Sequence, residues 1–350
     1  MNSAKHILFL VPGFPADEND FNCIPPLQEF LLKFKSAYPS ARISVIAFQY
    51  PYHNKQYLWN SINIFPMAGK NNACMKSFVW LRAIKTAKNL NKENQVEVIH
   101  SLWLGECAMI GNLLAKKFNC EHICTLMGQD VKSNNRYLRL SKNERIKIIA
   151  LSQNQSDQFL KLTNRKVNGI IHWGIEDQKF ENLGRDIDLL AVGSLIPLKN
   201  YSLFIKVIAE LKRMYPDLNC KLVGTGPELA ALKNMANGKG VGENIEFTGL
   251  LSRQEIFKLM QKSKIFVHPS KFEGSGFVFA EALVNGMNIV SFNVGYAQEH
   301  PKWFIAKDEK DFIQIAKDLI TTSMDYNPVN LFPLVETAER YAGIYGIKRF

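Results

Sequence analysis

The chain has 350 residues, of which 47% are hydrophobic, and it carries 43 lysines and arginines against 32 acidic residues. This length suits two folded domains, and the composition excludes fibrous and disordered classes. No run approaches the roughly 18 uninterrupted apolar residues that a membrane-spanning helix requires. The six cysteines lie too far apart for a secreted disulfide framework, which favours a reducing cytosol.

The positive charge is concentrated in the first half. Residues 1–172 hold 22 lysines and arginines against 11 acidic residues, whereas the remainder holds 21 of each. A basic half can bind an acidic lipid or a phosphorylated acceptor, or it can be a plain solvated surface, and composition leaves both open. We do not expect nucleic-acid binding, because no recognised binding motif accompanies the charge.

Short apolar runs alternate with segments of helical period along the whole chain, the pattern of strand–helix units around parallel sheets. The first run is too short for a signal-peptide core and has no cleavage site after it, so we interpret it as a buried strand. We expect strands at residues 7–11, 43–48, 96–100, 122–127, 146–151 and 169–172, and then at 189–193, 221–224, 245–248, 265–268 and 288–292.

Residues 120–124 read CEHIC and place three potential metal ligands on one strand face. No second ligand pair at zinc spacing accompanies them, so we expect buried thiols and no metal. Residues 172–180 read HWGIEDQKF and lead into a polar stretch through residue 186. This segment is the expected hinge between two α/β domains.

Parallel sheets of this kind bind ligands beyond the carboxyl ends of their strands, and the most informative segment lies at such a place. Residues 268–283 read HPSKFEGSGFVFAEAL and run from a strand through a glycine-rich turn into a helix. The N–H groups at the start of a helix near Gly276 suit a phosphate. Glu273 and Glu281, with seven residues between them, would both face that ligand.

This combination resembles the signature of family 4 glycosyltransferases and their GT-B relatives, the "glycosyl transferases group 1" family. Residues 190–200, 222–228 and 245–249 resemble further family segments in the same order, so that the similarity covers most of residues 188–300. The resemblance implies an α/β protein of the GT-B fold, in which two Rossmann-like domains face each other across a cleft.

The resemblance also implies roles for the residues of the second half. Lys199 would bind the donor diphosphate, where a leaving group develops negative charge. Glu273 would hold the sugar and Glu281 the ribose hydroxyls. The remaining donor-binding candidates are Gly13, Ser194, Gly224, Gly249, Leu250, Lys271, Gly274, Ser275, Gly276, Phe277 and Val278.

Two positions depart from the family pattern. Ser194 stands where the family usually has a phosphate-binding arginine, and Lys271 is the candidate to replace that cation. Met127 stands where the family has a histidine facing the donor sugar, which implies altered sugar recognition or impaired transfer. Asp130 then becomes the catalytic candidate of this loop, with helix capping as the alternative.

The first half matches the family more loosely. Gly13 is expected opposite the donor phosphates, where a side chain would obstruct the sugar, although a turn glycine explains it equally well. His100, Met127 and Gly128 are the candidates on the acceptor side. Lysines and arginines follow at positions 132, 136, 139, 142, 145 and 147, the first three on a predicted helical face. This cluster can contact an acidic lipid or a phosphorylated acceptor, or it can be a plain solvated surface.

Residues 335–345 resemble the final GT-B helix, which crosses back to the first domain. We therefore predict an acceptor-binding domain at 1–172 plus 333–350 and a nucleotide-sugar-binding domain at 173–332.

The predicted function is retaining transfer of a sugar from a UDP- or GDP-linked donor to a saccharide or lipid-linked acceptor hydroxyl, without metal or cofactor. The expected setting is bacterial polysaccharide, lipopolysaccharide or glycolipid assembly, in the cytoplasm or at the inner face of the membrane. Two alternatives stay open: a GT-B sugar-nucleotide epimerase or hydrolase, and a non-catalytic GT-B partner subunit.

Overall fold

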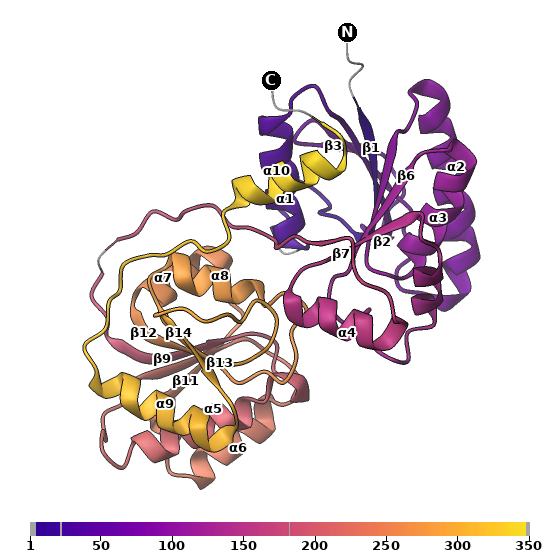
Figure 1. Ribbon diagram of the computed structural model, residues 1–350. Helices are drawn as coiled ribbons and strands as arrows, with labels where there is room; N and C mark the ends of the chain where they lie inside the picture. The colour runs from indigo at the N-terminus through magenta and orange to yellow at the C-terminus, as the bar shows by residue number, and fades with distance from the viewer. Residues whose placement is uncertain (1–4, 22, 182, 348–350) are drawn as a thin grey trace. The chain divides into compact units, whose positions relative to one another are not determined.

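The protein packs as two compact units (Figure 1). The computed structural model describes residues 5–21, 23–181 and 183–347, so the outermost ends of the first predicted domain, at 1–4 and 348–350, lie outside the described residues. The first unit comprises residues 1–174 and 334–350, and the second comprises residues 175–333. The predicted boundaries, after 172 and before 333, differ from these by two residues and one residue.

The first unit is built on an eight-stranded sheet with the order β3-β4-β2-β1-β5-β6-β7-β8 among the described residues. Its strands are β1 (His6–Gly13), β2 (Arg42–Tyr50), β3 (Tyr57–Trp59), β4 (Ile62–Pro66), β5 (Val98–Leu102), β6 (Glu121–Thr125), β7 (Ile146–Ala150) and β8 (Gly169–Ile170). Its α-helices are α1 (Pro25–Ala37), α2 (Lys76–Glu93), α3 (Glu106–Phe118), α4 (Gln153–Thr163) and α10 (Leu334–Ile344). Neighbouring strands are parallel except β3, which is antiparallel to β4.

Helices cover both faces of this sheet, which explains why β1 is apolar along nearly its whole length. Successive side chains of a strand point to opposite faces. Leu8 and Leu10 accordingly join the apolar core beneath α2 and α3, whereas Phe9 packs on Phe30 of α1. The six strands predicted in this half are all present, within a few residues of their expected bounds.

The β3–β4 hairpin was missed by the sequence prediction. Its strands are short, and its turn is formed by Asn60 and Ser61, both with positive φ (46° and 64°). This conformation suits a two-residue hairpin turn, but the Asn-Gly sequence that usually signals such a turn is absent.

Helix α10 returns to the first unit and packs beside α1, where the resemblance placed it (Figure 1). Tyr341 of this helix and Tyr345, which directly follows it, are fully buried. The Tyr341 hydroxyl lies 2.8 Å from Thr125 Oγ1, and the Tyr345 hydroxyl lies 2.6 Å from Nδ1 of His100. The end of the chain therefore supplies part of the first unit's core.

The second unit is built on a parallel six-stranded sheet with the order β11-β10-β9-β12-β13-β14. Its strands are β9 (Ile187–Val192), β10 (Cys220–Val223), β11 (Ile245–Gly249), β12 (Ser263–His268), β13 (Asn288–Phe292) and β14 (Trp303–Ala306). Its α-helices are α5 (Tyr201–Leu211), α6 (Leu229–Gly238), α7 (Arg253–Gln261), α8 (Phe277–Val284) and α9 (Glu309–Thr321). Five of these strands were predicted; β14, a short edge strand, was not.

The basic run of the first unit differs from its prediction. Residues Arg136–Lys142 form a 3₁₀ helix, and Lys132 precedes it, so the three expected positions do not share one α-helical face. Asn143 ends this helix with an extended conformation. In the described part of the chain, no helix combines the length and the apolar character needed to cross a membrane.

We expect Tyr341→Ala to lower the free energy of unfolding by about 3–5 kcal/mol, because it opens a cavity in a closely packed aromatic core. Tyr341→Phe, which keeps the ring and loses the hydroxyl contact with Thr125, should cost about 1 kcal/mol. Urea denaturation followed by circular dichroism measures both. Phe78→Ala, at a side chain that is 63% exposed, is the matched control; equal losses at both positions would contradict this assignment.

Candidate functional site

The residues singled out in the second half gather at the carboxyl ends of β9, β10, β11 and β12. Here four loops meet, at residues 193–200, 224–227, 249–252 and 269–276. The loop after β9 is tied to the loop after β12, since the Leu198 carbonyl accepts hydrogen bonds from the Lys271 N–H (3.0 Å) and the Ser270 hydroxyl (3.3 Å). These bonds bring segments about 70 residues apart into one site.

A carboxylate with two nitrogen partners lies at the centre of these loops. Oε1 of Glu273 is 2.5 Å from Nζ of Lys199 and 2.8 Å from Nε2 of His268. Glu273 and Lys199 are only 12% and 18% exposed, and His268 is fully buried. The sequence predicted Lys199 and Glu273 as site residues but gave His268 no role.

The charges of this cluster follow from its burial. Burial acts to raise the pKa of Glu273, but the hydrogen bond from His268 and the positive charge of Lys199 outweigh it and lower the pKa to about 2. Burial lowers the pKa of His268, which is therefore neutral and donates through Nε2. Glu273 is thus an ionised acceptor, with Lys199 as its cation.

Two buried polar atoms beside this cluster have no hydrogen-bond partner among the described residues. They are the Nδ1 atom of His268 and the hydroxyl of Tyr201. Native proteins pair nearly all such atoms with protein groups or water, so both are candidates to contact a bound ligand. Tyr201 is the first residue of α5, and sequence analysis did not single it out.

Helix α8 begins directly after this cluster. Its N-cap, Gly276, has φ 71°, and a Cβ there would lie 2.6 Å from the ring of Phe279, so glycine is required for this entry into the helix. The first N–H groups of a helix lack partners within it. The predicted donor-binding residues of this segment, Gly274, Ser275, Phe277 and Val278, lie on either side of this helix start.

Glu281 lies in the second turn of α8 and forms an ion pair that the sequence analysis missed. Its Oε1 accepts a hydrogen bond from Nε of Arg253 at 2.8 Å. Burial raises the pKa of Glu281, and Arg253 opposes that rise. Arg253 opens α7 behind a capping box formed by Ser252 and Glu255, and this sequence pattern could have located it.

Close backbone packing shapes the loops after β9 and β10. A Cβ on Gly224 (φ 133°) would lie 2.0 Å from the Gly193 carbonyl oxygen, so glycine is obligatory there. Ser194 and Lys271 are exposed at this edge. Gly249 has φ 74° with open space beside it, and the following Leu250 is 78% exposed, an apolar surface that a planar base could cover.

In the first unit, Gly13 lies at the carboxyl end of β1. A Cβ there would lie 3.5 Å from Cys23 Sγ and 3.6 Å from Tyr50 Cβ, which are ordinary contacts, and its φ is not in the left-handed region. No described residue of this unit requires glycine at position 13. The turn-glycine explanation therefore loses its basis.

Asp130 has a different task from those predicted. It is buried, and its carboxylate accepts hydrogen bonds from the N–H groups of Leu104 (2.8 Å), Met127 (3.1 Å) and Gly128 (2.8 Å). Burial raises its pKa, and these bonds act to lower it. Because its carboxylate oxygens already accept hydrogen bonds that connect two loops, they are not available for the predicted catalytic role. It caps no helix either, since the next one is capped by Asn135.

His100 does not belong to an acceptor surface. It is fully buried, and its ring nitrogens contact Tyr345, directly after α10, and Thr125 of β6. Burial lowers its pKa to about 3, so the ring is neutral. The prediction was wrong because the sequence does not show that the segment around α10 covers β5. Met127 is half-buried and Gly128 is buried in the loop that Asp130 holds.

No cluster of three or more histidine, cysteine or carboxylate side chains suited to a metal occurs in the residues that the structure covers. Cys124 is buried, as expected from the CEHIC segment. Cys120 is half-exposed and precedes β6, which corrects its predicted placement on the strand.

Comparison with known proteins now identifies this site's family. Residues 175–303 match the family described as "Glycosyl transferases group 1". The second unit belongs to the group 1 glycosyltransferases. The matched segment contains Lys199, Arg253, Glu273 and Glu281. The subdivision into family 4 remains a prediction.

Relatives extend this similarity beyond the second unit. An uncharacterised glycosyltransferase from Methanocaldococcus jannaschii is 29% identical over 61% of this chain and 61% of its own length. A GDP-mannose-dependent alpha-(1-6)-phosphatidylinositol monomannoside mannosyltransferase from Mycolicibacterium smegmatis is 30% identical over 32% of this chain and 31% of its own. The aligned segments thus span less than two thirds of these relatives.

Solved structures establish the fold. The Anabaena protein HepE, crystallised in complex with UDP, superposes with a TM-score of 0.69 at 16% identity and covers 97% of this chain and 99% of its own. The chain therefore has the GT-B fold that the sequence predicted, with a Rossmann-like α/β sheet in each unit.

Because Glu273 is ionised in the folded protein, we predict that the free energy of unfolding depends on pH. Its folded-state pKa of about 2 lies below the value near ~4.3 of an unfolded chain, so the ionised carboxylate stabilises the fold above pH ~4.3 and this contribution is lost as the pH falls. We expect Glu273→Gln to cost about 2 kcal/mol at pH 7, the size of a charged hydrogen bond. Thermal melting at several pH values should show the difference from the native protein shrinking below pH ~4.3. Glu246→Gln, at an exposed ion pair with Lys221, is the control; a difference independent of pH would contradict the assignment.

Proposed function

We propose that this protein transfers a sugar from a nucleoside diphosphate sugar to an acceptor hydroxyl, with retention of configuration and without a metal ion. The observation that carries the proposal is the contact of Lys199, Glu273 and His268 next to the start of α8. It combines one cation and one ionised acceptor in direct contact, with the start of a helix three residues after Glu273. These are the groups that a diphosphate bonded to a polyhydroxylated sugar requires.

In this proposal Lys199 and the start of α8 bind the diphosphate. The departing nucleoside diphosphate gains negative charge in the transition state, and fixed positive groups stabilise that charge without reorganising. Lys199 is paired with Glu273, so a bound diphosphate would compete for the same ammonium group. The protein's own carboxylate thus holds the lysine ready for the phosphate.

Glu273 would then bind sugar hydroxyls. Because its pKa is low, it accepts hydrogen bonds at any physiological pH, and neutral His268 fixes its orientation from behind. Glu281, held by Arg253, would accept hydrogen bonds from the ribose. Leu250 would cover one face of the base. A front-face substitution, in which the leaving phosphate accepts the acceptor proton, needs no protein nucleophile and fits this set of groups.

The donor and acceptor classes are also proposals. A UDP- or GDP-linked donor is supported by the UDP in the HepE structure and by the GDP-mannose dependence of the mycobacterial relative. That relative acts on a phosphatidylinositol glycolipid, which supports a lipid-linked or saccharide acceptor in bacterial polysaccharide, lipopolysaccharide or glycolipid assembly. The exposed Arg136, Arg139 and Lys142 could contact an acidic membrane surface, consistent with a cytoplasmic protein bound at the inner face.

The two glutamates should separate binding from turnover. We expect UDP or GDP at 100 times its Kd to stabilise the protein by about 2.7 kcal/mol, equally with and without EDTA. Glu281→Gln should weaken that binding about tenfold, the loss of one charged hydrogen bond. Glu273→Gln removes the carboxylate that competes for Lys199, so it should not weaken nucleotide binding, whereas it should lower kcat about 100-fold. Thermal melting and a donor-turnover assay measure the two quantities.

Glu255→Gln, at an exposed helix cap near the site, is the control for these variants. Product analysis separates the alternatives, because an epimerase releases a new sugar nucleotide and a hydrolase releases free sugar. If no nucleotide shifts the melting temperature, we would instead assign the chain as a non-catalytic partner subunit. Met127 and Ser194, which depart from the family pattern, favour that alternative.

Gly13 provides a test within the first unit. We expect Gly13→Ala to melt within about 2 °C of the native protein, because the new methyl group meets only ordinary contacts at 3.5 and 3.6 Å. If a donor approaches this backbone, kcat/KM should fall about 100-fold through misplacement of the sugar. Gly169→Ala, whose Cβ would likewise meet one contact at 3.6 Å, is the matched control. Equal activity of both variants would remove Gly13 from the site.

A further inference from the structure

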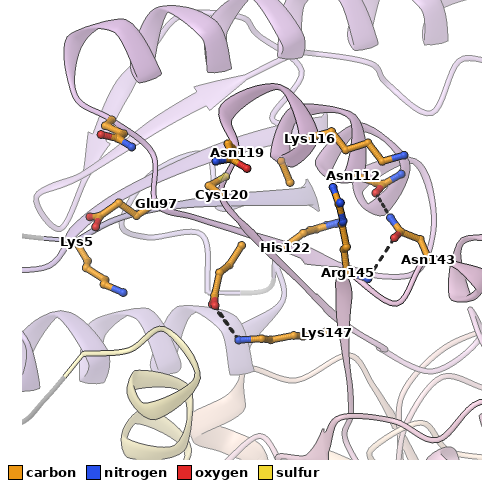
Figure 2. Close-up of a pocket in the computed structure, with 13 residues that line it drawn as sticks. Lys5, Glu97, Asn112, Lys116, Asn119, Cys120, His122, Asn143, Arg145 and Lys147 are labelled. Atoms are coloured by element: carbon orange, nitrogen blue, oxygen red, sulfur yellow. Dashed lines mark hydrogen bonds and ion pairs between the residues drawn. The ribbon is translucent and has the colours of Figure 1, made fainter.

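A polar cavity of about 570 Å³ lies at the amino-terminal edge of the first unit's sheet (Figure 2). Its walls come from the residues that precede or begin β5, β6 and β7 and from the second half of α3. These strands are parallel to β1, so Gly13 and the Asp130 loop lie at the opposite edge of the same sheet. The cavity is therefore separate from the residues discussed above, and its volume is that of a small-molecule site.

His122 of β6 lines this cavity and has one unused ring nitrogen. Its Nε2 lies 2.9 Å from the Ser101 hydroxyl, which donates its own hydrogen to the Cys107 carbonyl at 3.0 Å. Ser101 must therefore accept from Nε2–H, which fixes the tautomer. Nδ1 is then an acceptor, and it is buried without a hydrogen-bond partner among the described residues.

The neighbouring helix is adapted to this histidine. Gly111 lies inside α3, where glycine costs about 1 kcal/mol relative to alanine. A Cβ at this position would lie 2.3 Å from Ser101 Oγ and 2.5 Å from His122 Nε2. Any other residue in place of Gly111 would displace the pair, so the helix accommodates the imidazole at a cost to its own stability. Burial lowers the pKa of His122 to about 3, which keeps Nδ1 an acceptor at neutral pH.

The rim of the cavity is positively charged. Four of its residues are cationic and two are acidic. Lys147 pairs with Glu121 at 3.0 Å, and Lys5 donates to the Tyr345 carbonyl at 2.8 Å. Lys116 and Arg145 are exposed at the rim and have no carboxylate partner in the part of the chain that the structure describes. Two cations without carboxylate partners among the described residues therefore line the same cavity as His122, whose buried Nδ1 has no donor.

We propose that this cavity is a binding site for a small hydroxylated anion of the sugar-phosphate class, with the phosphate at Lys116 and Arg145 and a hydroxyl group donating to His122 Nδ1. An anion without hydroxyls would satisfy the rim and leave Nδ1 unpaired. A neutral sugar would satisfy Nδ1 and leave the cations unused. Amide side chains at Asn112 and Asn119, also in the lining, offer further hydrogen bonds to hydroxyls.

Isothermal titration calorimetry of the full chain tests this site without any transferase assay, and so independently of the proposed function. The probes are glucose 6-phosphate, glucose and inorganic phosphate. We expect glucose 6-phosphate to bind at least tenfold more tightly than either fragment. The double variant K116Q/R145Q, at two exposed side chains, should weaken its binding at least tenfold. Lys117→Gln, the next residue of α3 and outside the cavity lining, should leave it unchanged.

Glu281→Gln separates this site from the proposed donor site, because it should not change the affinity for glucose 6-phosphate. Four results would overturn the proposal: no binding of glucose 6-phosphate, inorganic phosphate binding equally well, equal weakening by Lys117→Gln, or loss of binding in Glu281→Gln. The second would reduce the site to a phosphate-binding rim, the third to general charge attraction, and the fourth would place the ligand in the second unit.

Discussion

The ion pair between Lys199 and Glu273 is the constraint on which the arrangement of the second unit's loops depends. Two charges this little exposed are stable only when each has a partner and further hydrogen bonds. His268 supplies one such bond from the fully buried end of β12. The bonds from residues 270 and 271 to Leu198 keep the two loops at the required distance. The same contacts that stabilise the loops also present a cation and an acceptor to a ligand.

Buried polar groups organise the first unit in a different way. His100 lies within β5, and Asp130 lies in the loop that follows β6, where the family resemblance placed functional groups. The polar atoms of both side chains are occupied by hydrogen bonds within the unit. His100 bonds to Tyr345, and Asp130 accepts hydrogen bonds from three backbone N–H groups. Their contribution is to fix the shape of the loops around Met127. A titratable residue at a strand end therefore indicates a site only when part of its hydrogen-bonding capacity is free.

Three side chains of the two candidate sites meet that criterion, among other buried polar atoms of the described residues. His268 and Tyr201 each keep one buried polar atom without a partner next to Glu273, and His122 keeps one at the far edge of the other sheet. A partnerless buried atom costs free energy that packing must offset, which is why such atoms are rare away from ligand sites.

The sequence by itself determined the fold class, the strands buried on both faces, and the helix start at Gly276, because apolar runs and a glycine-rich turn are local signals. The order of motifs up to Glu281 also determined the family. Arg253, His268 and the cavity around His122 were decided by tertiary structure, since each depends on contacts between distant segments that no local pattern records. The burial of His100 beneath Tyr345 is the clearest case, because 245 residues separate the two partners.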